Sequence, residues 1–167
     1  NKIRTIHGPA LQETFDYLRS EIDGRGGLAK EDSFLNNLGT SPKDANYFNF
    51  FLNLGSNFAR LSESDEFYSH WTTNGERANK VRSALAILHK ELSMDDLLSE
   101  NDIVARLSAY LNERTGEATA NISSEVAVGL LGVSKKIGHN HLGEWGMASS
   151  PHITPKGMRD MACLVLR

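Results

Sequence analysis

The stretch SPKDANYFNFFLNLGSNFARLSESDEFYSHW, residues 41–71, indicates a helix followed by a hairpin. It opens with Ser41, a good helix N-cap, and with Pro42, whose missing N–H costs nothing at the first helical position. Asp44 follows three residues after the cap, in the manner of a capping box. The sequence therefore predicts a helix that begins at Pro42 and is ended by Gly55.

Two apolar runs follow this helix and indicate a β-hairpin. Residues 58–61 and 67–71 flank the polar turn SESDE, residues 62–66. Two further helices are predicted upstream, at about 9–22 and 30–38, each with apolar residues at helical spacing and each followed by glycine. Three helices followed by a hairpin are the layout of a winged helix.

The same pattern then repeats. Asn74 or Thr73, then Ser99, then Ser123 or Asn121 are caps for three more helices, and a hairpin follows around the turn GHNHLG. SFLNNL (33–38) aligns with DIVARL (102–107), and Trp71 aligns with Trp145, an offset of about seventy residues that indicates two copies of one unit. We predict that each tryptophan anchors its hairpin to its own core.

The predicted fold is therefore mainly α with small β-hairpins, built from tandem winged-helix-like (helix-turn-helix) units. The predicted divisions are a first unit at 1–73, a second unit at 74–149, and a connector with the first helix of an incomplete third unit at 150–167. Thr154 and Pro155 are predicted to start this last helix. Because the chain begins without Met and stops inside a predicted helix, we expect it to be a fragment of a longer protein.

Composition narrows the class of function. A dedicated nucleic-acid binder is usually basic, whereas this chain has a net charge of −3 and a pI near 6.1. This composition favours a role in protein–protein contact. The single cysteine, Cys163, cannot form an internal disulfide or a cysteine-based zinc site. No apolar run approaches the roughly 20 residues of a membrane span. We predict a cytoplasmic location with no membrane partner.

Two clusters of polar residues could suggest a metal site or a catalytic site, but each has a simpler structural interpretation. His139 and His141 lack a third metal ligand, and polar residues of a hairpin tip explain them better. The acidic residues Asp95, Asp96, Glu100 and Asp102 fit the start of a helix, where the backbone favours negative charge. We therefore expect no metal, no cofactor and no enzymatic activity.

Direct DNA contact would rest on the third helix of each unit and on the hairpins. Asparagine side chains can read adenine edges, and lysine can contact phosphates. The candidate DNA-binding residues are Lys43, Asn46, Asn49, Asn53, Lys135, Lys136 and His139. The helix at 123–133 is nearly all apolar and is predicted to be buried.

Two apolar surfaces are candidates for partner contact. The aromatic run at 47–51 must place one face in the core, and its other face is either a partner surface or packs on the second unit. The terminal helix carries apolar residues that need a partner, by pairing between two chains as one alternative. The candidate partner-surface residues are Tyr47, Phe50, Met161, Leu164 and Val165.

The segment GEWGMASSPHITPKGMRDMACLVLR (143–167) resembles the segment that precedes and opens the C-terminal HARE-type helix-turn-helix domain of a class of bacterial sigma-factor-like proteins. The upstream stretches GRGGLAKEDSFLNNL, FNFFLNLGSNFARLSESDEFYSHW and VSKKIGHN also resemble the region that lies between the sigma region 4-like part and the HARE-type domain. His141, His152 and Cys163 depart from the residues common there. The resemblance implies transcription initiation, with RNA polymerase and promoter DNA as partners of the full-length protein.

Three hypotheses follow. The first is a non-catalytic scaffold or docking module that contacts RNA polymerase and places the flanking DNA-binding domains. The second is a direct DNA-binding module that uses helix 42–54 and the wings. The third is a structural dimerisation region in which the terminal helix forms a homodimer. The sequence names neither the promoter nor the polymerase surface.

Overall fold

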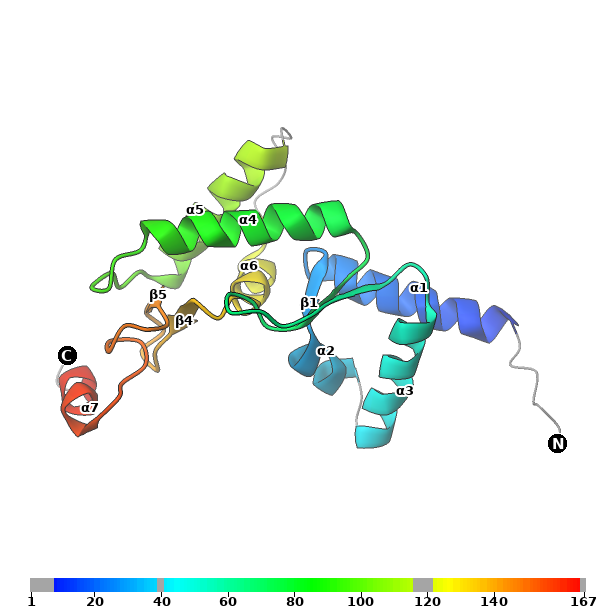
Figure 1. Cartoon of the computed structure of the whole chain (residues 1–167), viewed down its shortest axis with the longest axis horizontal. Coiled ribbons are helices and arrows are strands. Elements are labelled where there is room, and N and C mark those ends of the chain that lie inside the picture. Colours follow the sequence, from blue (N-terminus) through cyan, green and yellow to red (C-terminus); the bar gives the residue numbers. More distant parts are fainter. Residues whose placement is uncertain (1–7, 39–40, 116–121, 166–167) are drawn as a thin grey trace.

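A computed structural model of the chain describes residues 8–38, 41–115 and 122–165. The protein is mainly helical, with two small antiparallel sheets. Its elements form an elongated arch, with α1 (Gly8–Gly24) and α7 (Met158–Val165) at opposite ends (Figure 1). Within the described ranges, no helix has both the length and the apolarity needed to cross a membrane.

The first set of elements carries a three-stranded sheet. After α1 come β1 (Leu28–Lys30), α2 (Glu31–Leu38), α3 (Pro42–Leu54), β2 (Ala59–Leu61) and β3 (His70–Thr72). The strand order is β1-β3-β2, and both pairings are antiparallel. The hairpin was predicted, but β1 was not, because three residues after a glycine pair give no periodic signal.

The second set contains α4 (Gly75–Glu91), α5 (Glu100–Thr115), α6 (Ser124–Leu131), β4 (Ile137–His139) and β5 (Trp145–Met147). The strands β4 and β5 pair as an antiparallel hairpin. Leu98, just before α5, forms an isolated antiparallel bridge with Trp145, which extends this hairpin on its β5 side.

The two sets share one arrangement. In the first, Ala29 of β1 pairs with Trp71 of β3, and in the second Leu98 pairs with Trp145 of β5. In both, the residue two positions before the start of the second helix pairs with the tryptophan of the last strand. Both tryptophans are buried in their own clusters, as predicted.

The helix starts follow the predicted capping chemistry. The Ser41 side chain accepts a hydrogen bond from the Asp44 N–H at 3.4 Å, and Asn74 accepts from the Glu76 N–H at 3.0 Å. Ser123 likewise accepts from the Val126 N–H at 3.3 Å. Each cap satisfies a backbone donor that the helix itself leaves unpaired.

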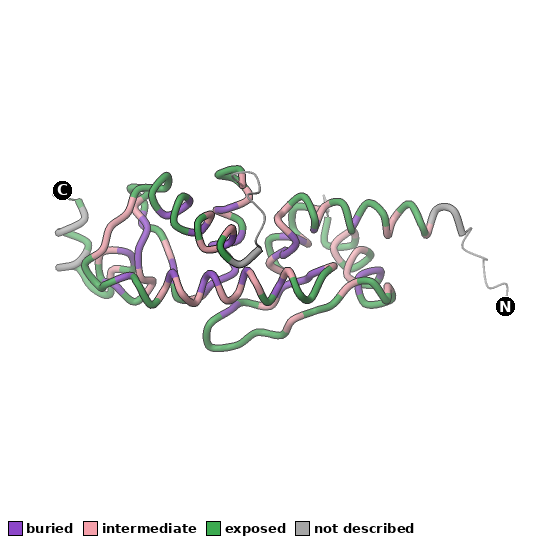
Figure 2. Tube along the Cα trace, turned by 90° about the horizontal axis from the view of Figure 1, so that it is seen from above, coloured by how far each residue is buried: buried purple, intermediate pink, exposed green. Residues whose placement is uncertain are grey.

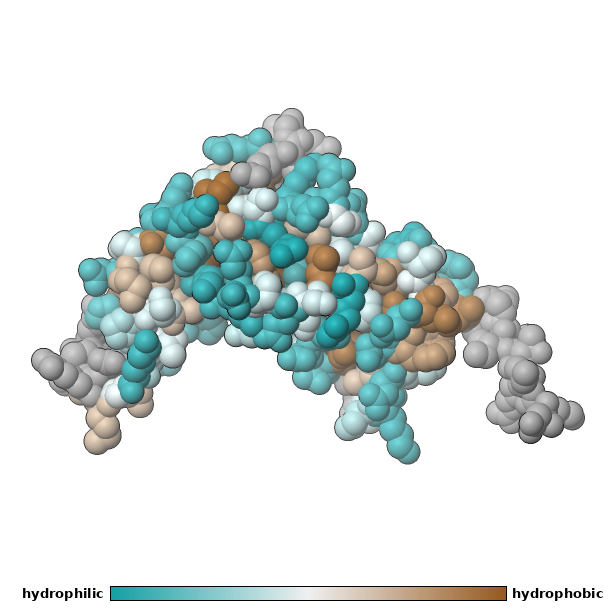
Figure 3. All heavy atoms as spheres, viewed as in Figure 1, coloured by the Kyte–Doolittle hydropathy of each residue, from teal (hydrophilic) through white to brown (hydrophobic). Residues whose placement is uncertain are grey.

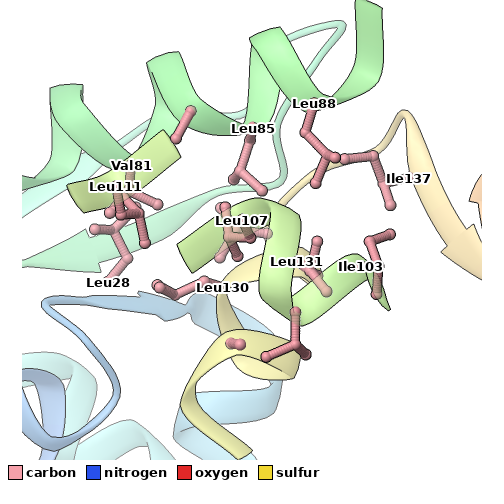
Figure 4. Close-up of a cluster of buried hydrophobic side chains, with 14 of the residues drawn as sticks. Leu28, Val81, Leu85, Leu88, Ile103, Leu107, Leu111, Leu130, Leu131 and Ile137 are labelled. Atoms are coloured by element: carbon pink, nitrogen blue, oxygen red, sulfur yellow. The ribbon is translucent and has the colours of Figure 1, made fainter. Parts of the chain in front are cut away.

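Two hydrophobic cores hold the arch together. The smaller core lies within α1, α2, α3 and the first sheet, and includes Leu18, Phe34, Phe51 and Trp71. The larger core is built mainly from α4, α5 and α6, but Leu28 and Phe67 of the first set belong to it. Figure 4 shows Leu28 of β1 beside Leu111 and Leu130 of the second set.

The backbone also links the two sets directly. The Tyr68 N–H donates to the Val133 carbonyl at 3.0 Å, and the Lys135 N–H donates to the Glu66 carbonyl at 2.8 Å. Phe67 and Ser134 thereby form an isolated antiparallel bridge. The hairpin of the first set is therefore part of the contact with the second.

Glycine allows the sets to approach closely. Gly26 has φ +84°, and a Cβ there would lie 2.9 Å from a Val126 methyl and 3.1 Å from a Leu130 methyl. A side chain at Gly26 would therefore be both strained and in collision with α6.

The start of the terminal helix was predicted wrongly. It begins at Met158 rather than at Pro155. The Ile153 and Thr154 N–H groups both donate to the Ser150 carbonyl, at 3.1 and 2.9 Å, and close a separate turn. Ile153 is buried, which holds this turn against the second set, and a helix forms only beyond Gly157.

Candidate docking surfaces

Helix α3 buries one side and exposes the other. Phe51 and Leu52 are buried, and the Phe15 ring of α1 meets the Phe51 ring edge-on at 5.8 Å. The capped start and the helical spacing of these residues fix which side faces the core. The opposite side therefore faces solvent.

The exposed side of α3 is apolar and aromatic. Tyr47, Phe50 and Leu54 have exposed fractions of 51%, 57% and 58%. Their spacing of three and four residues places them on one helical face, which we call the α3 patch. The alternative that this face packs on the second unit is therefore wrong.

Aromatic contacts hold the α3 patch in place. The Tyr47 and Phe50 rings lie 4.5 and 5.5 Å from the buried Phe51 ring. Tyr17 of α1, itself 46% exposed, lies beside Phe48 and extends the apolar surface toward α1. Figure 3 shows brown and tan spheres gathered where α3 meets α1. Rings anchored in this way lose little side-chain freedom on binding, which favours protein contact.

The predicted DNA-reading residues lie beside the α3 patch. Lys43, Asn46 and Asn53 are exposed, and Asn49 is half-buried. The Asn53 amide donates to the Asn49 carbonyl at 2.7 Å and to the Asn49 side-chain oxygen at 3.1 Å. Two of the three asparagines therefore already bond to each other along the helix.

The first hairpin carries an acidic turn. Glu63, Asp65 and Glu66 are exposed at its tip, and Figure 2 shows this turn as a long green segment. Lys135, predicted to contact phosphate, forms an ion pair with Glu63 instead, and its ammonium lies 5.4 Å from the Tyr68 ring centre. An acidic wing repels a phosphate backbone, so this turn is poorly suited to DNA.

A bidentate ion pair braces the same hairpin. Arg60 donates to both oxygens of Glu31 at 2.7 Å, and the Ser69 hydroxyl donates to Glu31 at 2.7 Å. The Arg60 hydrogen bond lowers the pKa of Glu31 and keeps this carboxylate charged. The ion pair ties β2 to the start of α2, and the Ser69 hydroxyl adds a contact from the residue just before β3.

The second hairpin leaves Lys136 and His139 exposed. The His139 ring lies 4.7 Å from the Trp145 ring, and its Nδ1 is 3.2 Å from the Asn140 carbonyl. The buried Asn140 side chain accepts from the Leu142 and Glu144 N–H groups at 2.9 and 3.0 Å and so shapes the turn. Figure 1 places this hairpin and α3 on opposite arms of the arch, so the predicted DNA-binding residues do not form one surface.

Helix α7 exposes a second apolar face. Met158, Met161 and Val165 have exposed fractions of 91%, 55% and 76%. The side chain of Leu164, also predicted for this surface, lies outside the described residues, as does that of Cys163. In the described part of the chain, no group of three or more His, Cys, Asp or Glu residues is arranged to hold a metal ion.

Sequence reasoning missed three features of these surfaces. It did not single out Leu54, Tyr17 or the ion pair between Glu31 and Arg60. Leu54 continues the spacing of Tyr47 and Phe50, so the helical repeat itself was the available signal. The ion pair joins residues 29 positions apart, for which the sequence carries no signal.

Comparison with known proteins gives no relative: no family model, no curated protein and no solved structure matches this chain.

Proposed function

We propose that this chain is a non-catalytic docking region of a sigma-factor-like transcription initiation protein, built from two tandem winged-helix units. The order helix, strand, helix, helix, strand, strand of the first set supports the winged-helix interpretation. The shared pairing of Ala29 with Trp71 and of Leu98 with Trp145 supports a duplication. The sigma-factor context rests on the resemblance of residues 143–167 and the upstream stretches.

The observation that carries the docking role is the α3 patch. In a winged helix that reads DNA, this helix enters the major groove and presents polar and basic side chains. Here it presents Tyr47, Phe50 and Leu54, beside an acidic wing. An apolar face suits a protein partner, and bacterial RNA polymerase is the partner that the resemblance implies.

Binding to bacterial RNA polymerase core enzyme tests this proposal. The chain is immobilised, and its affinity is compared with that of the triple variant Y47S/F50S/L54S. We expect the variant to bind at least about tenfold more weakly, because aromatic anchors carry much of an interface's binding energy. The matched control is Leu142→Ser, an equally exposed leucine on the second hairpin, which should bind as the unchanged chain does.

A parallel titration with duplex DNA over a range of salt concentrations separates the two binding roles. Steeply salt-dependent binding that is lost in K43A/N46A, together with no affinity for polymerase, would overturn docking in favour of DNA recognition.

A further inference from the structure

Two lysines from different sets of elements meet at one tyrosine. The Lys30 ammonium lies 3.7 Å from the centre of the Tyr68 ring, and the Lys135 ammonium lies 5.4 Å from it. Lys30 belongs to β1 of the first set, whereas Lys135 lies between α6 and β4 of the second. We call Lys30 and Lys135 the lysine pair.

Backbone pairing brings the lysine pair together. Lys30 pairs with His70 in the first sheet. The Lys135 N–H donates to the Glu66 carbonyl at 2.8 Å, and the Tyr68 N–H donates to the Val133 carbonyl at 3.0 Å. The fold therefore gathers the two cations before any ligand binds.

The charge of the lysine pair is only partly balanced. Glu63 forms an ion pair with Lys135, whereas among the described residues Lys30 forms no ion pair. Like charges that lie near each other repel, and the negative face of the Tyr68 ring offsets part of that repulsion. An anionic ligand that contacts both ammonium groups is therefore favoured here.

The acidic turn at 62–66 already supplies an anion to this surface. Its Ser64 side chain accepts from the Glu66 and Phe67 N–H groups at 3.3 and 3.1 Å, which shapes the turn. Glu66 meets Lys135 through its backbone carbonyl, but Glu63 contributes only a side chain. That side chain is 61% exposed, so its ion pair is weak, and rotation of one side chain releases Lys135.

Duplex DNA is a stronger polyanion than this turn. The turn carries three carboxylates, those of Glu63, Asp65 and Glu66, and all three residues are exposed. DNA carries one negative charge for about every 1.7 Å of its axis, and lysine is a common phosphate contact. The turn and a phosphate backbone would therefore compete for the same ammonium groups.

We propose that the acidic turn at 62–66 is an internal competitor that blocks contact between the lysine pair and the phosphate backbone of duplex DNA. The proposal does not rest on the α3 patch or on the polymerase. It predicts weak DNA binding by the unchanged chain and stronger binding once the turn is neutralised.

The test measures the affinity of the whole chain for a fluorescently labelled DNA duplex at low salt. The variant E63Q/D65N/E66Q removes the three carboxylates and keeps the backbone contact of residue 66. We expect it to bind at least about tenfold more tightly than the unchanged chain, with a gain that shrinks as salt is added.

The matched control is E13Q/D95N/E100Q, which changes the net charge equally at exposed residues of α1 and of the region around the start of α5. It should bind no more than about twofold more tightly than the unchanged chain. Melting temperatures should stay within a few degrees in both variants. Glu63→Gln alone, which leaves the rest of the turn intact, should give a gain of at least about threefold.

Two further variants locate the DNA contact. In the neutralised background, K30A/K135A should return the affinity to within about twofold of that of the unchanged chain. K43A/N46A in the same background should keep the gain, because these residues lie on α3.

An equal gain in the matched control, a gain that survives K30A/K135A, or no gain in the turn variant and in Glu63→Gln would overturn the proposal. A gain that is lost in K43A/N46A would overturn it in favour of DNA contact by α3. An equal gain for poly-glutamate would overturn it in favour of an acidic protein segment. Polymerase binding by the α3 patch is measured separately, so either proposal can fail while the other stands.

Discussion

Helices α3 and α6 each precede the last two strands of their set of elements, but they meet different neighbours. Helix α3 exposes Tyr47, Phe50 and Leu54, whereas α6 buries Ala127, Leu130 and Leu131. Helix α6 lies against the turn at Gly26, whereas among the described residues no element covers the outer face of α3. Two helices in corresponding places can therefore differ: α3 exposes an apolar face to solvent, whereas α6 packs at the contact between the two sets of elements.

Replacing either buried tryptophan should have the largest effect on stability. Trp71→Ala and Trp145→Ala should each cost about 3–5 kcal/mol of unfolding free energy, because each removes a large buried side chain. Because Leu28 and Phe67 join the larger core, we expect one cooperative urea transition in each variant. Circular dichroism and tryptophan fluorescence would follow it, and two separate transitions would show that the units unfold independently.

One leucine on each of the helices α3 and α6 tests the difference between them. Leu130→Ala should cost about 2–4 kcal/mol, since Leu130 is fully buried. Leu54→Ala, on the exposed face of α3, should change stability by no more than about 0.5 kcal/mol. Chemical denaturation measures both losses of unfolding free energy. Equal losses would contradict the assignment of α3 as a solvent-exposed face and of α6 as a buried contact between the two sets of elements.

Helix boundaries were largely predictable from sequence, whereas contacts between the units were not. Ser41, Asn74 and Ser123 act through the backbone within three residues, so local sequence encodes them. The bridge between Phe67 and Ser134 depends on how two distant segments meet. For the aromatic run at 47–51, the pattern specified a buried face but not whether anything covers the other.

The glycine turn is the next test. Gly26→Ala should cost about 1–3 kcal/mol, because it combines a left-handed φ with contact against Val126 and Leu130. Gly143→Ala is the control: its φ is +78°, but no neighbour lies within 4 Å of its would-be Cβ. The denaturation midpoint should fall further for Gly26→Ala than for Gly143→Ala. An equal fall in both variants would mean that backbone strain alone, and not contact with α6, accounts for the loss of stability at Gly26.

The smallest effect concerns pH. His70 is fully buried, and its Nδ1–H donates to the Tyr68 carbonyl at 2.7 Å, so its Nε2 is left bare and without a partner among the described residues. Burial, with a smaller contribution from nearby Arg82, lowers the pKa of His70 below its usual 6.5. The unfolded chain therefore binds a proton at a higher pH than the folded chain does.

Stability should consequently be unaffected by this group above pH 6.5 and should fall as the pH drops below that value. Unfolding free energies measured at several pH values would show this slope. It should flatten in His70→Gln, and an unchanged slope in that variant would assign the effect to other groups.

The pairing of Tyr68 with Val133 and of Lys135 with Glu66 also limits how the gene can be divided. The sequence suggests a division in the short connection after Thr72, between the two predicted units. It would nevertheless leave Leu28 and Phe67 facing water on one product, and uncover the matching apolar side of α4 and α6 on the other. Expression of either half alone is therefore expected to give aggregation, and the shortest soluble piece is one that keeps both halves on a single chain.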